Sequence, residues 1–302
     1  MPSSNTIYVH AFDPLNTFLP DQTMGYTVRG ADIYGILGTE MCTPTALGGL
    51  APLTYVQQVY PAYTVDWAEN DAGVYTKRFY KGSWVLGWPG MSPTMSDDEA
   101  NEFTTALEQE DILSDDLVKI ARVSAPDPSN RNVWGSEIRN LLVSACTEVE
   151  SQLKGILKAN GYALPDRPNT SDYVKVCAPM RLEEYSITLS RYRNYGDIWP
   201  FRGWTPATGV PGVGPTTSLP WYNAYNLTKH DRETNFNVAT LEHAISAVAG
   251  LAVLLAAQYG PNGCRPFRES FFTFGSRPNW LHKDRYYAPP PGEQWAPVPY
   301  QF

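Results

Sequence analysis

The longest regular hydrophobic pattern lies between residues 133 and 160, where apolar residues recur at every third or fourth position. This spacing places them on one face of an α-helix. Gly161 follows, and glycine readily adopts the left-handed conformation that ends a helix. The pattern predicts a core helix of about seven turns. Its expected core residues are Trp134, Ile138, Leu141, Leu142, Ala145, Val149, Leu153, Ile156 and Leu157.

Polar residues border the apolar stripe of this predicted helix. Arg139, Cys146 and Glu150 share one border, and Lys154 follows Glu150 by four residues. Side chains four residues apart are neighbours on a helix surface, so we expect Glu150 and Lys154 to pair. The border is therefore a predicted place for partly buried polar contacts.

A second long apolar segment lies between residues 236 and 260, and from Ala244 onward it is apolar on nearly every face. Such a pattern predicts a central helix that is touched by neighbours on all sides. Residues 203–220 precede it and contain four prolines. Because proline lacks a backbone N–H, we expect a connecting loop there, or a mobile cover over a site.

The first 93 residues are rich in Tyr, Thr, Gly and Pro and have no sustained helical period, which predicts short strands and turns. The clearest pair of strands is Val74 to Tyr80 and Trp84 to Trp88. Both runs are aromatic and β-branched, and a Lys-Gly-Ser turn separates them. They predict a β-hairpin that is held by cross-strand aromatic contacts.

Two helix starts follow this region. Ser96 and Ser114 each precede acidic residues, as in capped helices, so we expect two short acidic helices before Pro126. Residues 181–195 alternate imperfectly between apolar and polar positions, which favours a strand or a pair of strands.

Together these patterns predict an α+β chain in three parts. Residues 1–95 form a β- and loop-rich aromatic region, and residues 96–284 form a helical bundle domain with core helices at about 133–160 and 236–259. Residues 285–302 form a Pro-rich extended arm that lies on its own domain or on a partner.

Composition narrows the classes of partner. The formal net charge is −8 and the pI is about 5.1, which argues against an electrostatic grip on nucleic acid. The four cysteines are scattered and none stand at metal-ligand spacing, so we expect no metal, no cofactor and a reducing compartment. The N-terminus lacks the features of a signal peptide. The apolar run from Ala244 to Ala257 is shorter than the roughly 18–20 residues of a membrane span, so we expect a cytoplasmic protein.

The candidate chemistry lies in the Lys-His-Asp-Arg string at residues 229–232. The imidazole of His230 suits proton transfer near neutral pH, Asp231 can orient it, and Lys229 and Arg232 can hold an anion. The other interpretation is structural. In it His230 bonds to the backbone at a helix junction, Asp231 caps the next helix, and Arg232 pairs with a surface carboxylate.

Two blocks of sequence, Glu137 to Gly161 and Tyr222 to Leu254, resemble the HEPN-like helical domains of prokaryotic toxin, abortive-infection and RNA-processing proteins. The second block is also similar to uncharacterised bacterial proteins that carry a Tyr-Asn-x-x-Lys-His-Asp-Arg string. The resemblance implies a bundle of four or five helices, usually paired as a dimer. It also implies a metal-independent RNase site, built from an Arg and a His, at the dimer seam.

The residues match this pattern in part. His230 stands at the histidine position, but the expected arginine positions hold Asn223, Ala224 and Tyr225. Arg232 or Arg139 is the alternative source of a guanidinium, and Asn223 or Asn226 can add a polar contact.

Three functions therefore stay open. The first function is that of a non-catalytic interaction module, which forms a homodimer and binds an RNA or protein partner. In this case we expect internal salt bridges to hold residues 229–232 in place. Alternatively it acts on RNA in a defence or toxin system. His230 then serves as acid or base, Lys229 and Arg232 stabilise phosphate charge, and Asn226 orients the substrate. The third function is an assembly subunit whose arm, residues 285–302, wraps a neighbour.

Overall fold

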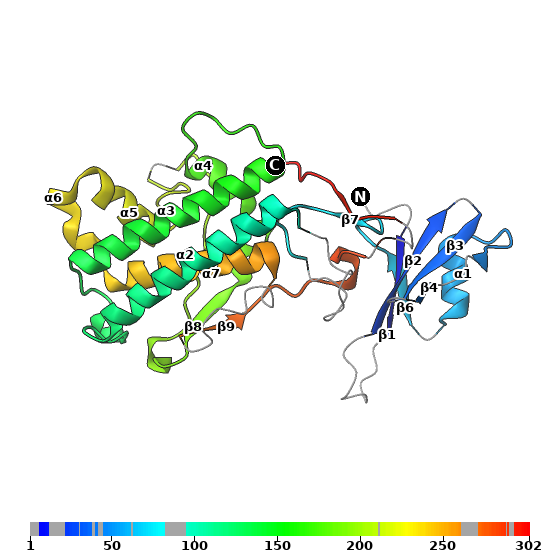
Figure 1. Ribbon diagram of the computed structural model, residues 1–302, viewed down its shortest axis with the longest axis horizontal. Helices are drawn as coiled ribbons and strands as arrows, with labels where there is room; N and C mark the ends of the chain where they lie inside the picture. Colours follow the sequence, from blue (N-terminus) through cyan, green and yellow to red (C-terminus); the bar gives the residue numbers. More distant parts are fainter. Residues whose placement is uncertain are drawn as a thin grey trace. The chain divides into compact units, whose positions relative to one another are not determined.

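The computed structural model describes residues 6–11, 22–29, 31–37, 40–41, 45–61, 63–81, 95–210, 212–260, 271–287, 289 and 293–302. These residues form an α+β protein, with strands concentrated in the N-terminal part and long helices after it, as expected (Figure 1). The chain divides into two units. Unit 1 contains residues 1–76, 81–95 and 279–298, and unit 2 contains residues 77–80, 96–278 and 299–302.

Unit 1 is built on an antiparallel sheet with the strand order β4-β3-β2-β1-β6. A further strand, β5, pairs with β3, and helix α1 packs against the sheet. The buried core joins Ile7 and Ile33 of the sheet with Leu47 and with Val56 of α1. The elements are β1 Thr6–Ala11, β2 Gln22–Arg29, β3 Asp32–Leu37, β4 Glu40–Met41, β5 Thr45–Ala46, α1 Pro52–Val59 and β6 Thr64–Trp67.

The expected hairpin is different in the structure. Of its first run, only β7, Val74–Tyr75, is a strand, and it pairs in parallel with β10, Ala296–Pro297. Residues 77–80 leave unit 1 and belong to unit 2, where their backbone and side chains bond to helices. The second run, residues 84–88, lies outside the described residues. Residues 285–302, expected as one arm, are divided: those up to 298 belong to unit 1 and the last four to unit 2.

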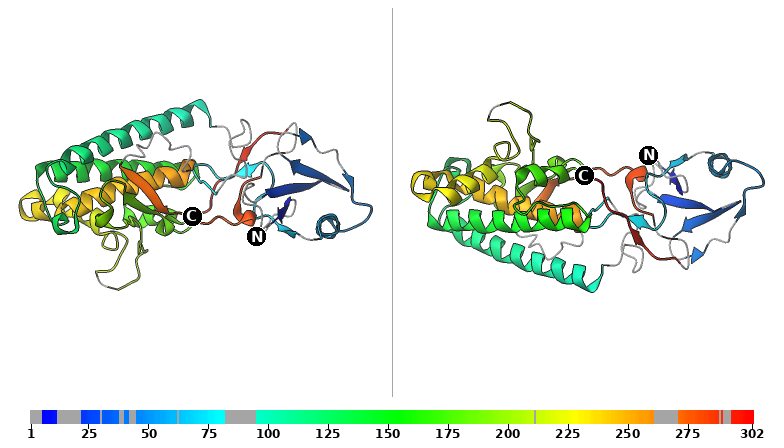
Figure 2. Two further views of the ribbon diagram at one scale, coloured as in Figure 1. Left: turned by 90° about the horizontal axis from the view of Figure 1, so that it is seen from below. Right: turned by 90° about the horizontal axis from the view of Figure 1, so that it is seen from above.

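Unit 2 is a helical bundle around α7, Leu241–Tyr259, which packs along α3, Ser136–Ala159, and also contacts α2, Asp97–Ala121, and α5, Pro220–His230 (Figures 1 and 2). A two-stranded antiparallel sheet completes it, with β8 at Ser186–Leu189 and β9 at Phe272–Ser276. The short elements are α4 Thr170–Tyr173, α6 Arg232–Asn235 and the 3₁₀ turns Pro128–Asn130, Val174–Val176, Leu182–Glu184, Arg193–Tyr195 and Phe236–Val238 in unit 2 and His282–Asp284 in unit 1.

Helix α3 confirms the first sequence pattern. Nearly all of its expected core residues are buried, and Gly161 after its end has a φ of 72°. Trp134 is the exception, because the helix begins only at Ser136 and 52% of the Trp134 surface is exposed. Glu150 and Lys154 pair across one turn at 3.6 Å, as expected. Cys146, at the same border, is a free buried thiol.

Helix α2 is one helix of 25 residues and not the expected two. Ser96 caps its start, and a reciprocal hydrogen bond with Glu99 completes a capping box. Ser114 lies inside this helix and does not begin a second one, and its hydroxyl donates to the carboxylate of Glu110 one turn earlier, at 2.7 Å. A side-chain partner inside the helix therefore replaces the capping role that the sequence suggested.

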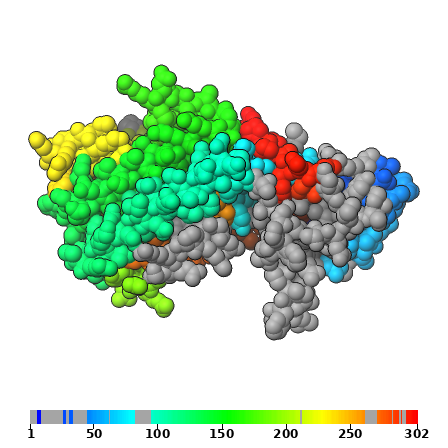
Figure 3. Space-filling view, in the orientation of Figure 1, coloured from blue at the N-terminus to red at the C-terminus, as the bar shows by residue number. Residues whose placement is uncertain are grey.

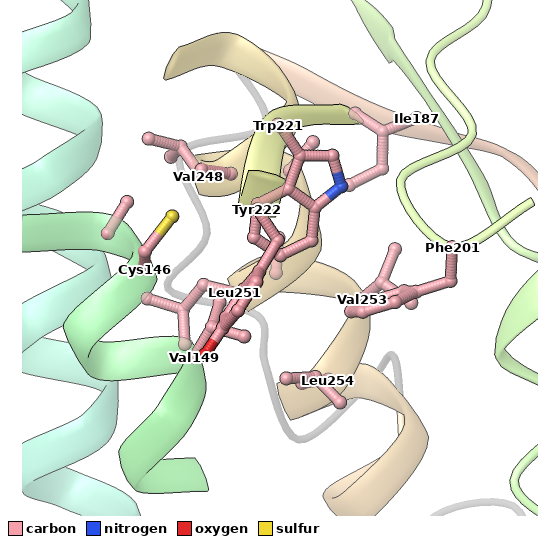
Figure 4. Close-up of a cluster of buried hydrophobic side chains, with 14 of the residues drawn as sticks. Cys146, Val149, Ile187, Phe201, Trp221, Tyr222, Val248, Leu251, Val253 and Leu254 are labelled. Atoms are coloured by element: carbon pink, nitrogen blue, oxygen red, sulfur yellow. The ribbon is translucent and has the colours of Figure 1, made fainter. Parts of the chain in front are cut away.

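Helix α7 is buried along almost its whole length, as its composition predicted, although it begins at Leu241 and not at Phe236. Figure 4 shows side chains of α3, α5 and α7 meeting in this core. Among the described helices, α7 alone is long and apolar enough to cross a membrane. Its apolar window has a mean hydropathy of 1.5 and is 83% buried, as in a core helix. We expected no membrane span because the apolar run from Ala244 to Ala257 is too short. Helix α7 has 19 residues and is longer than that run.

Candidate functional site

The predicted site residues lie at one end of unit 2, where α5 meets α6 (yellow in Figure 3). Helix α5 starts with Pro220, which fits the first position of a helix because its missing N–H has no partner there. The helix ends with His230, whose side chain is exposed. Asp231 then accepts a hydrogen bond from the backbone N–H of Thr234 at 3.1 Å and caps α6. Hydrogen bonds from the Thr234 side chain and backbone lower the pKa of Asp231 below its usual range.

The cations on either side of His230 are held by aromatic rings. The Lys229 ammonium donates to the Tyr225 hydroxyl at 2.6 Å and lies 4.8 Å from the centre of that ring. This hydrogen bond raises the pKa of Lys229. The Arg232 guanidinium lies 5.6 Å from the ring centre of Phe236. The salt bridges expected for residues 229–232 are not observed, because no ion pair among the described residues includes them.

Arg139 of α3 reaches the same end of α5. Its Nη2 donates to the carbonyl oxygen of Thr228 at 3.4 Å, and its Nη1 lies 3.5 Å from the side-chain oxygen of Asn140. The Nε of Arg139 is buried and has no hydrogen-bond partner. A cation near the last carbonyls of a helix is favourable, because these groups carry the negative end of the helix dipole. The structure thus places Arg139 close to the end of the helix that carries His230.

Helical spacing divides the side chains of α5 into two faces. Asn223, Asn226 and His230 follow at three and four residues and share one face, and the two amides are half-buried. Tyr222, Tyr225 and Lys229 share the neighbouring face, where both tyrosines are buried. The two predicted amides therefore lie on the same helix face as His230, whereas Lys229 lies on the tyrosine face.

A polar contact between α3 and α5 was missed at the sequence level. The Tyr222 hydroxyl donates to Glu150 at 2.5 Å, and burial together with this bond raises the pKa of Tyr222 strongly. Cys146 is fully buried one turn before Glu150, and burial raises the pKa of its thiol well above the usual value. The border of the predicted helix contained Cys146 and Glu150, but without a predicted helix at residues 220–230 the sequence could not show the partner of Glu150.

The exposed indole of Trp134 at this end of unit 2 was also missed. The indole of Trp134 packs edge-to-face on Phe236, with ring centres 5.5 Å apart. The backbone of Trp134 forms a bridge with Thr240, and the Leu241 N–H donates to the Val133 carbonyl at 2.8 Å. A half-exposed indole therefore stands on a fixed backbone. Its helical spacing had suggested a core position.

In the described part of the chain, no group of three His, Cys, Asp or Glu side chains is placed to hold a metal ion. No protein-family model, curated protein or solved structure matches this chain.

Proposed function

We propose that this chain is a non-catalytic interaction module that pairs with a second copy through the α5–α6 end of unit 2. The observation that carries the proposal is Trp134, which is 52% exposed although its backbone is fixed and its ring rests on Phe236. An exposed, pre-ordered tryptophan, packed on a phenylalanine that also contacts Arg232, has the composition of an interface hot spot, because little side-chain entropy remains to be lost on binding.

The charged residues that precede Phe236 in the chain suit a second copy of the same surface. Residues 229–233 read Lys-His-Asp-Arg-Glu, and all five residues are exposed. In a two-fold interface each residue meets the same patch of the partner, so cations and anions that alternate along a short stretch can pair across the axis. The HEPN-like resemblance, with its usual dimer, supports the same arrangement.

The contacts of the Lys-His-Asp-Arg string support binding over catalysis. Lys229 is bonded to Tyr225, Asp231 caps α6, and Arg232 lies over Phe236. Each of these contacts gives its group a structural role at this end of unit 2. The string therefore shapes the surface that carries Trp134.

Sedimentation equilibrium tests the proposal. We expect the wild type to form a dimer, and Trp134→Ala to weaken its association at least about 100-fold, the loss of a hot-spot side chain. Ile112→Ala is the matched control, because Ile112 of α2 is also 52% exposed; its dimer should be unchanged. A wild type that is monomeric at high micromolar concentration, or equal effects of the two substitutions, would contradict the proposal.

Action on RNA is the second candidate, and the position of Arg139 favours it. Its guanidinium reaches the Thr228 carbonyl at the end of α5 that carries His230. The test is incubation of transfer RNA with wild type and His230→Ala in the presence of a metal chelator. Cleavage by the wild type that His230→Ala abolishes would support a nuclease. Identical products from both proteins would contradict an RNase activity that depends on His230.

A further inference from the structure

Residues 77–80, Lys-Arg-Phe-Tyr, are bound to unit 2 in the manner of a short peptide. The residues on either side of them belong to unit 1. The backbone N–H of Tyr80 donates to the carbonyl of Ala257 at 2.8 Å, and the carbonyl of Lys77 accepts from the amide of Asn160 at 3.1 Å. One end of the tetrapeptide is thus fixed by a main-chain hydrogen bond to α7, and the other end is fixed by the side chain of Asn160, the residue after α3.

Arg78 enters a site that is shaped for a guanidinium. Its Nε donates to the side-chain oxygen of Gln258 at 2.6 Å, and its Nη2 donates to that of Gln152 at 2.7 Å. Glu102 lies 3.6 Å from Nη1. We call Glu102, Gln152, Gly155 and Gln258 the Arg78 site. Three of its members present oxygens around a planar fork, which is the geometry that distinguishes arginine from lysine.

Gly155 makes room for this guanidinium. A Cβ at Gly155 would stand 1.9 Å from Nη1 of Arg78, so any other residue at this position of α3 would force the guanidinium to shift. Glycine inside a helix lowers helix stability, which makes its presence here informative. Arg78 itself has a φ of 58°, in the left-handed region that is unfavourable for a side chain with a Cβ. The main chain is thus strained at the residue that inserts.

The neighbouring residues extend the recognition beyond one side chain. Lys77 pairs with Glu99 of α2 at 3.1 Å. Phe79 is buried and stacks on Tyr300, with ring centres 5.4 Å apart. Unit 2 therefore offers a carboxylate to a lysine, a fork of oxygens to an arginine and an aromatic wall to a phenylalanine, in that order.

We propose that the Arg78 site and the surfaces beside it form a docking site for a Lys-Arg-aromatic peptide of a partner protein, which the chain's own residues 77–80 occupy. The acidic groups Glu99 and Glu102 match the charge of such a peptide. The covalently attached segment has a high effective concentration, so a partner peptide must displace it. The inference rests on a site other than the α5–α6 end, and its failure leaves the proposed function unchanged.

The first experiment empties the Arg78 site and refills it with a small cation. Arg78→Ala is titrated with methylguanidinium in the millimolar range, and the melting temperature is measured. We expect it to rise for Arg78→Ala, and not for the wild type or for Arg78→Ala/Gly155→Leu, in which a side chain fills the space. Methylammonium, with the same charge and no planar fork, should have no effect. If Arg78→Ala does not fold, Arg78→Gln takes its place.

The second experiment supplies the whole segment. A fluorescein-labelled peptide, Tyr-Thr-Lys-Arg-Phe-Tyr-Lys, is titrated with the wild type and with Arg78→Ala/Phe79→Ala, and anisotropy is measured. The variant should bind at least about ten-fold more tightly than the wild type, and a peptide with Ala for Arg should lose that gain, because hydrogen bonds to a charged group are the strong ones. A folded variant that binds neither the peptide nor methylguanidinium would overturn the proposal. Equal binding of the Arg and Ala peptides would also do so.

Discussion

Unit 2 contains two short basic segments in opposite environments. Residues 77–80 enter the bundle, where the Arg78 side chain is 9% exposed and amide oxygens hold its guanidinium. Residues 229–232 stay at the surface, where Lys229 and Arg232 rest on aromatic rings. The comparison teaches that a conspicuous run of charges need not be where charge has the largest energetic effect. A cation acts most strongly where it is desolvated and its partners are fixed.

Replacing each arginine by alanine should show this difference most clearly. Arg78→Ala removes the charged donor from the oxygens of Gln152 and Gln258, and we expect it to lower the free energy of unfolding by about 4 kcal/mol. Arg232→Ala is the matched control at the surface, with an expected change within about 0.5 kcal/mol. Urea unfolding followed by circular dichroism measures both. Similar losses would contradict the contrast between the two segments.

A pH titration extends the comparison to a buried carboxyl group, Glu110, whose hydrogen-bond partner is an uncharged hydroxyl. Glu110 is buried in α2, accepts a hydrogen bond from Ser114, and burial raises its pKa from 4.5 to about 7. Between these values the folded state holds the proton that the unfolded chain has lost. The free energy of unfolding should therefore fall as pH rises through this window, by about 3 kcal/mol in total.

Glu110→Gln keeps an acceptor for Ser114 and cannot ionise. Unfolding in urea at about pH 5 and about pH 8 compares it with the wild type, and the contribution of Glu110 should disappear from the variant. A variant with the same pH dependence as the wild type would show that another group is responsible.

A double-mutant cycle tests the fit of the Arg78 site. Gly155→Ala places a methyl group where the guanidinium lies, so we expect a loss of about 2 kcal/mol in the wild type. In the Arg78→Ala background the space is empty, and the same change should stabilise α3 by up to about 1 kcal/mol through helix propensity. Additive effects in the cycle would mean that the two positions do not interact.

The smallest effect is expected at His230. Its side chain is exposed, and His230→Ala should change the free energy of unfolding by less than about 0.5 kcal/mol. Thermal unfolding checks this value. A substantial loss would mean that His230 has a structural contact and belongs with Arg78 and not with the surface.

The fold was predictable for helices whose own sequence pattern shows which of their residues are buried. The spacing of apolar residues found α3, and the uniform apolar composition found α7. The site was predictable only in part: Asp231 caps a helix as one interpretation expected, but the partners of Lys229 and Arg232 are aromatic rings. The buried site of Arg78 could not be predicted from the sequence. Its partners Gln152 and Gln258 lie far along the chain, and no sequence pattern marks these glutamines as ligands of an arginine.

The stack of Phe79 on Tyr300 has a consequence for the order in which the molecule can form. Asn160 bonds to Lys77 with its amide nitrogen and to Tyr300 with its amide oxygen, at 3.1 Å and 2.9 Å. During synthesis residues 77–80 emerge early, but the last aromatic partner emerges only with residues 299–302. These contacts have a large sequence separation, which slows their formation. The helices of unit 2 can therefore assemble on a growing chain, whereas its final aromatic closure must wait until translation reaches the last residues of this sequence.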